Sequence, residues 1–151
     1  MNFKLTWFGH AALELETQGL HILVDPFISG NPAATIKAAD LKPEFILITH
    51  GHGDHIGDTV EIAKRSQSLV ISNFEIAQWL SAKGVKTHAQ STGGGFNHPF
   101  GYLKLTQAVH GSMLPDGSDG GFPAGLLITL MDGRKVYLAG DTGLFGDMRL
   151  I

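Results

Sequence analysis

The chain has 151 residues, of which 43% are hydrophobic and 17% are charged, and its formal net charge is −3. These values describe one folded domain with a substantial core, and they give no reason to expect a nucleic-acid or anionic-membrane partner. Because the sequence contains no cysteine, disulfides, thiolate metal sites and cysteine nucleophiles are excluded.

Three strands are predicted over residues 3–25, with a hairpin turn at Gln18-Gly19. The third strand ends at Asp25, and an acid at the end of a buried strand needs a partner. We expect Asp25 either to accept the second ring N–H of a metal-binding histidine or to cap the turn. His10, in the turn between the first two strands, is either an ordinary turn residue or a residue that faces the site.

Residues 26–43 form a connection with one short predicted helix, after which strands and helices alternate. Phe74 and Trp79 are interpreted as core residues of a helix that a capping box opens. The alternation indicates a layered α/β fold. The elements expected in this part are a helix over Ala33–Ala39, a strand over Phe45–Ile48, a helix over Asp58–Arg65, a strand over Leu69–Ile71 and a helix that begins at Ser72–Glu75.

The strand predicted at Phe45–Ile48 is followed by a cluster of side chains that bind metals. Three imidazoles and a carboxylate lie within six residues, and they suit Zn²⁺ or another borderline divalent metal. We expect them on a loop, where Gly51 and Gly53 remove side-chain bulk so that the backbone can fold around an ion. The candidate ligands are His50, His52, Asp54 and His55.

Two further candidate ligands follow predicted strands in the C-terminal half. Residues 91–101 are interpreted as a loop with a solvated His98, and its glycine run lacks the residues of a phosphate-binding loop. The next strand ends at His110, and residues 111–124 form a loop long enough to shape a pocket. A hairpin over residues 126–139 then ends at Asp141. Three separate strands therefore end at candidate ligands.

These motifs together resemble the metallo-β-lactamase superfamily. The spacing His50-x-His52-x-Asp54-His55, the later His110 and the segment Gly140-Asp141-Thr142 carry the resemblance. The opening Trp7–Ala11 and the pair Asp25-Pro26 look most like its metal-dependent hydrolases related to the ascorbate-phosphate lactonase and the phospholipase D-type enzymes. The resemblance covers essentially the whole chain. It implies an α/β fold, a four-layer αβ/βα sandwich with a two-metal site along one edge.

The resemblance also implies a role for each candidate ligand. By position, a first ion is held by His50, His52 and His110. A second ion is held by Asp54 and His55, and Asp141 bridges both.

The same resemblance implies two divalent metal ions, with zinc expected and manganese, iron or nickel as alternatives. The implied activity is hydrolysis of an ester, lactone or phosphoester in a small-molecule substrate by a hydroxide between the metals. Catalytic roles fall to Asp54 and Asp141, while Asp25 and His10 are expected to support the ligands.

The family pattern continues beyond Asp141 and adds a histidine to the second ion, whereas no histidine follows His110 here. We therefore expect a single metallo-hydrolase domain over residues 1–151 that lacks the C-terminal strands and helices of its second half. Truncation is favoured over completion by a separate chain, and the protein partners considered are a second copy or a complementing chain. The alternatives are a non-catalytic metal-binding fragment and a redox di-iron protein of the same fold, in which an acid usually replaces His52.

The sequence shows no targeting or membrane-spanning segment. The N-terminus lacks the apolar core of a secretory signal, and no window reaches the length of a transmembrane helix. A cytoplasmic location is therefore predicted.

Overall fold

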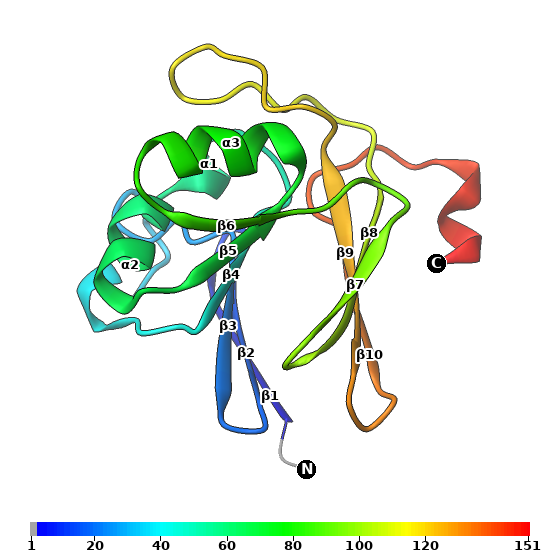
Figure 1. Cartoon of the computed structure of the whole chain (residues 1–151), viewed down its shortest axis with the longest axis horizontal. Helices are drawn as coiled ribbons and strands as arrows, with labels where there is room; N and C mark the ends of the chain where they lie inside the picture. Colours follow the sequence, from blue (N-terminus) through cyan, green and yellow to red (C-terminus); the bar gives the residue numbers. More distant parts are fainter. Residues whose placement is uncertain (1–2) are drawn as a thin grey trace.

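The computed structural model describes residues 3–151, and two β-sheets that face each other form its centre (Figure 1). The first sheet has six strands in the order β1-β2-β3-β4-β5-β6, and the second has four in the order β10-β9-β8-β7. Three helices lie on the outer face of the first sheet, so the layers run helix, sheet, sheet (Figure 1). The predicted α/β class is confirmed, as is the sandwich of sheets.

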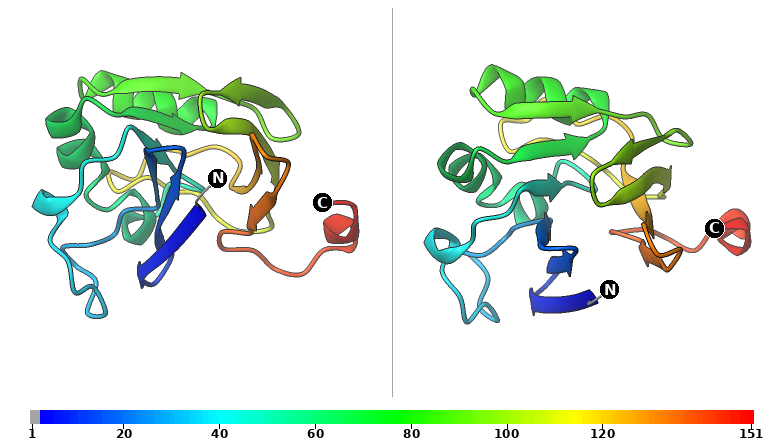
Figure 2. Two further views of the ribbon diagram at one scale, coloured as in Figure 1. Left: turned by 90° about the horizontal axis from the view of Figure 1, so that it is seen from below. Right: turned by 60° about the horizontal axis from the view of Figure 1, so that its bottom comes forward.

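The strands of the first sheet are β1 (Phe3–Gly9), β2 (Ala12–Thr17), β3 (Leu20–Val24), β4 (Phe45–Leu47), β5 (Leu69–Ser72) and β6 (Lys86–Ala89). Those of the second are β7 (Gly95–His98), β8 (Gly101–Gln107), β9 (Ala124–Leu130) and β10 (Lys135–Leu138). The helices are α1 (Gly53–Ile56), α2 (Thr59–Ser66) and α3 (Phe74–Ala82), with 3₁₀ turns η1 (Ala38–Asp40) and η2 (Gly146–Leu150). The C-terminal segment with η2 lies on the side of the second sheet away from the helices (Figure 2).

Strands β3 to β6 are parallel; β3, β4 and β5 lie inside the first sheet and are mostly buried, whereas β6 forms its edge. Successive side chains of a strand point to opposite faces. In β4, Ile46 packs toward the helices, whereas Phe45 and Leu47 pack toward the second sheet. This double burial explains why β4 reads as a continuous apolar run rather than an alternating one.

The expected helix over Ala33–Ala39 is wrong, because only η1 forms there. The Asn31 side chain accepts a hydrogen bond from the backbone N–H of Ala33 at 2.9 Å and donates to the carbonyl of Phe27 at 3.1 Å. These bonds fold the start of the segment into turns. A helix of that length has too few internal hydrogen bonds to compete with them.

The helix predicted from the capping box forms as α3, but its rotation differs from the prediction. Asn73, not Ser72, caps it by accepting from the backbone N–H of Ile76 at 2.9 Å. The buried face of α3 consists of Ile76, Ala77 and Leu80, whereas Phe74, the first residue of the helix, is 56% exposed, so its assignment to the core is wrong. Trp79 packs against the core as expected.

Residues 91–101 are not the simple loop that was predicted, because Gly95–His98 forms β7 and pairs with β8. His98 is 7% exposed, so its predicted solvation is also wrong. Its Nε2 lies 2.9 Å from Gln90 Oε1, and its ring stacks on Phe100. The β7–β8 hairpin places His98 opposite Gly101 and turns the ring into the space between the sheets.

Because His98 is buried, we predict that the free energy of unfolding falls in acid. Burial, together with the neighbouring His88, lowers the pKa of His98 to about 4. The unfolded state therefore binds a proton first as the pH falls from 6.5 toward 4, and this lowers the free energy of unfolding by up to about 3 kcal/mol. We expect His98→Gln to reduce this pH dependence in urea unfolding. Identical pH profiles for His98→Gln and the wild type would contradict the assignment.

Within residues 3–151 we find no helix with the length and hydropathy needed to span a membrane.

Candidate metal centre

The candidate ligands meet at one edge of the two sheets. Asp25 and Thr49 follow β3 and β4, which are parallel and therefore end on the same side. His110 and Asp141 follow β8 and β10, which are both antiparallel to β9 and so run in the same direction. The backbone N–H of Ala124 donates to the carbonyl of Thr49 at 2.9 Å and joins the sheets at this edge.

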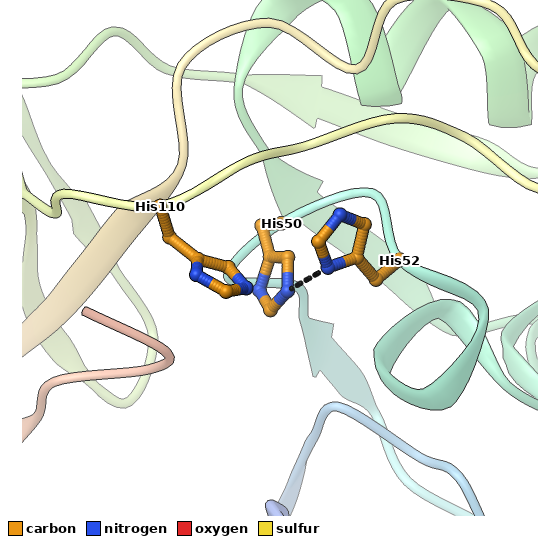
Figure 3. Close-up of side chains that lie close together, drawn as sticks. All are labelled: His50, His52 and His110. Atoms are coloured by element: carbon orange, nitrogen blue, oxygen red, sulfur yellow. Dashed lines mark hydrogen bonds between the residues drawn. The ribbon is translucent and has the colours of Figure 1, made fainter. Parts of the chain in front are cut away.

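Three imidazoles converge in the first group, which consists of His50, His52 and His110 (Figure 3). One ring nitrogen from each lies within 4.8 Å of the others, and His50 Nε2 is 3.1 Å from His52 Nδ1. Two nitrogens at the usual zinc–nitrogen distance from one ion lie about 3–3.5 Å apart. The spacing of this group therefore fits a single ion.

Asp141 lies between the first group and a second group, which consists of Asp54 and His55. Its Oδ2 is 3.6 Å from His110 Nε2 and 3.5 Å from His55 Nε2. The second group is built on the short helix α1 rather than on a loop, which corrects the prediction for Asp54 and His55. Because adjacent helical residues point about 100° apart, His55 is fully buried while the Asp54 side chain is 50% exposed. The ring of His10 faces this group, with its Nε2 3.0 Å from Asp54 Oδ2.

His55 is bonded through only one of its ring nitrogens. Its Nδ1 lies 2.9 Å from Asp25 Oδ2, whereas its buried Nε2 has no hydrogen-bond partner among residues 3–151. Buried polar atoms nearly always have a partner. A divalent cation beside His55 and Asp141 supplies what this nitrogen lacks, so the residues present fit a metal ion.

Asp25 supports a histidine of each group through hydrogen bonds. Its carboxylate accepts from the Thr49 backbone N–H at 2.8 Å, from Thr49 Oγ1 at 2.6 Å and from His55 Nδ1. Since the Thr49 hydroxyl donates to Asp25, it accepts from His50 Nδ1, which lies 3.0 Å away. In the neutral form that metal binding requires, both histidines then present an unprotonated Nε2 to the site. Of the two roles considered for Asp25, the geometry matches the partner of a ligand histidine.

Sequence reasoning missed Thr49, although its place between a buried strand and His50 was visible. It also treated both glycines of the motif alike. A Cβ on Gly51 would lie 2.7 Å from the carbonyl oxygen of Ser112, whereas one on Gly53 would meet nothing within 4 Å. Only Gly51 is needed for close packing, and its N–H donates to Ser112 Oγ at 3.0 Å.

The electrostatics of the two buried histidines differ. Burial lowers the pKa of His50 to about 3, and the neighbouring His55 and His52 add to this effect. His50 is therefore a neutral imidazole at physiological pH, as a metal ligand must be. Burial also opposes a charge on His55, but the hydrogen bond that His55 donates to Asp25 and the charges of Asp25 and Asp141 outweigh it and raise its pKa.

A sandwich of two sheets with a histidine- and aspartate-lined edge defines a metallo-hydrolase. Residues 21–150 match the family described as beta-lactamase superfamily domain, and the chain belongs to that family. It is 52% identical over 153 residues to the UPF0173 metal-dependent hydrolase of Bacillus pumilus (strain SAFR-032), an alignment that covers 98% of this chain and 67% of the relative. The family predicted from the motifs is thus confirmed.

Solved structures show the same likeness. Igni18, a metallo hydrolase from Ignicoccus hospitalis KIN4/I, has a TM-score of 0.87 and 37% identity, covering 99% of this chain and 65% of its own. CmlA, a diiron beta-hydroxylase from Streptomyces venezuelae, has a TM-score of 0.74 at 23% identity, covering 97% of this chain and 31% of its own, and shows the fold alone. The chain thus spans about two thirds of the length of the Bacillus pumilus relative and of Igni18.

Proposed function

We propose that this chain carries the metal centre of a hydrolase that cleaves an ester, lactone or phosphoester bond in a small molecule. The unpaired, buried Nε2 of His55 beside Asp141 is the observation that carries the proposal. The converging first group and the metal-dependent hydrolases among the relatives support it. We propose two divalent ions, and the imidazole-rich ligand set favours zinc.

The residues would divide between the ions as follows. The first ion would be held by His50, His52 and His110, and the second by Asp54 and His55, with Asp141 shared between them. A divalent ion at such a site lowers the pKa of bound water and polarises a carbonyl or phosphoryl oxygen.

The proposed ligands differ in their exposure, and one side of the centre is open to solvent. His50 and His55 are fully buried, whereas the side chains of His110 and Asp141 are 35% and 40% exposed. A substrate therefore reaches the centre from the side of His110 and Asp141. Asp141 Oδ2, between the two groups, would orient the attacking water, and the Asp54 side chain is 50% exposed.

Removal and return of metal tests this function. We expect protein stripped with a chelator to lose turnover of p-nitrophenyl ester, lactone and phosphodiester substrates, and added zinc to restore it. Because ligands that bind only the folded state stabilise it, zinc at about 100 times its Kd should raise the free energy of unfolding by about 3 kcal/mol. Elemental analysis gives the number of bound ions.

Two outcomes would count against the proposal. If protein refolded with zinc retained no metal, the whole proposal would fail. One tightly bound ion without turnover on any substrate would instead support the non-catalytic metal-binding fragment. A cytoplasmic location and association with a second copy or a complementing chain stay predictions.

A further inference from the structure

A buried serine joins two chain segments beside the first group. Ser112 follows His110 by two residues and is 8% exposed. Its Oγ accepts from the backbone N–H of Gly51 at 3.0 Å and donates to the carbonyl of Gly120 at 3.0 Å. The direction of both bonds is fixed, because an amide N–H can only donate and the hydroxyl has one proton. The Ser112 side chain therefore connects the segment after β8 to the segment after β4.

The amide that Ser112 binds lies between two proposed ligands. Gly51 separates His50 from His52, so a shift of its amide moves both rings. These two histidines follow β4 in the first sheet, whereas His110 follows β8 in the second (Figure 3). Ligands on different segments bind one ion well only if the surrounding contacts hold the segments in a fixed relation.

The backbone packs closely on both sides of Ser112. A Cβ on Gly51 would lie 2.7 Å from the carbonyl oxygen of Ser112, and a Cβ on Gly120 would lie 2.0 Å from the same oxygen. Real Cβ atoms essentially never come so close to another heavy atom. Ser112 is therefore confined between two backbone segments that leave no space for a side chain.

The second of these segments is itself attached to α3. The Gly120 carbonyl accepts a further hydrogen bond from Asn73 Nδ2 at 2.6 Å, and Asn73 Nδ2 also donates to the carbonyl of Phe122 at 2.9 Å. Asn73 is 5% exposed and caps α3. Loop 111–123 thus extends from the second sheet to the helices (Figure 1). Its contact with Gly51 is supported from the helix side.

We propose that Ser112 is a positioning residue for the first ion. Through the amide of Gly51 it holds the two ligands of the first sheet in place against His110. This inference rests on the proposed metal centre and deepens it, because it names a contact on which the geometry of the first group depends. His55 is held by Asp25 instead, so the loss of the Ser112 hydroxyl should affect the first ion more than the second.

Replacing Ser112 by alanine tests this role with cobalt(II) as the probe. Cobalt accepts the same nitrogen and oxygen ligands as zinc, and its visible absorption depends on the coordination geometry. Ser112→Ala leaves the Gly51 N–H without its partner. We expect cobalt affinity to fall about 10–100-fold, as for other residues that support a metal ligand, and the spectrum of bound cobalt to change. Ser112→Thr restores a hydroxyl and should reverse both effects.

Ser68→Ala is the matched control. Ser68 is 1% exposed, and its Oγ donates to the carbonyl of Pro43 at 2.6 Å. It precedes β5 and so lies at the edge of the first sheet opposite the metal centre. Each alanine variant loses one buried hydrogen bond, so both should remain folded and show similar losses in urea unfolding of the metal-free protein. Cobalt affinity and the cobalt spectrum should change only in Ser112→Ala.

The possible results are distinct. Wild-type cobalt affinity and spectrum in Ser112→Ala would overturn the inference. Equal changes in Ser112→Ala and Ser68→Ala, or no recovery in Ser112→Thr, would also overturn it. The proposed function would survive each of these results, because the wild type would still bind the metal. If the wild type bound neither cobalt nor zinc, the proposed function and the inference would fail together.

Discussion

Replacing His52 by alanine is expected to remove tight binding of the first ion and to lower kcat/KM by more than about 100-fold. Mutation of a residue that only supports a metal ligand already lowers affinity or activity by about 10–100-fold, so the loss of a ligand should lower them further. His52 Nδ1 lies 3.1 Å from His50 Nε2, and His52 is only half-buried. Its removal therefore leaves no large cavity, and the free energy of unfolding of the metal-free protein should change little.

Elemental analysis, steady-state kinetics and urea unfolding of the metal-free protein would measure these effects. His88→Gln, a half-buried histidine on β6 outside both groups, is the control and should match the wild type in metal content and turnover. Wild-type turnover in His52→Ala, with the metal content unchanged, would remove the first group from the proposed centre.

Replacing Asp25 by alanine is expected to have the largest effect on stability. The Asp25 carboxylate is 1% exposed and accepts three hydrogen bonds from Thr49 and His55. Its removal leaves these donors buried without a partner, and breaking such a buried charged contact costs about 3–5 kcal/mol. That is a large part of the stability of an ordinary domain. Urea unfolding of the metal-free protein would measure the loss.

Thr49→Val tests the same network in a variant that should fold. Valine keeps the shape of the side chain and removes only the hydroxyl that joins Asp25 to His50. We expect affinity for the first ion to fall about 10-fold, while His55 and the second ion are unaffected. Equal weakening of both ions, or of neither, would show that Asp25 does not act on His50 through Thr49.

The sequence predicted those features that depend on local pattern. The run Phe45–Ile48 is apolar because β4 is buried on both faces, and the ligand motif follows it directly. The helix predicted over Asp58–Arg65 forms as α2, where the i,i+4 pair Glu61 and Arg65 lies 3.1 Å apart. Ligands at the ends of strands could be expected to meet, because parallel strands end on one side.

Features that depend on packing between distant segments could not be read from local pattern. Phe74 looked like a core residue by helical spacing, yet the face that packs on the sheet is centred on Ile76 and Leu80 and leaves Phe74 exposed. His98 precedes a proline, as loop residues do, and only the pairing of β7 with β8 shows that it is buried. The left-handed backbone of His10, with a φ of 51°, is likewise imposed by contacts with Trp7 that have no signature of their own.

The position of the ligands on two different sheets has a consequence for folding. The ligands of the proposed first ion follow β4 in one sheet and β8 in the other. An ion held between His50 and His110 would therefore crosslink segments far apart in the chain. Such an ion binds only when both segments are in place, so its binding free energy adds to the free energy of unfolding and couples the two sheets. In a chain without cysteine, the metal would thus join the two sheets where other proteins use a disulfide.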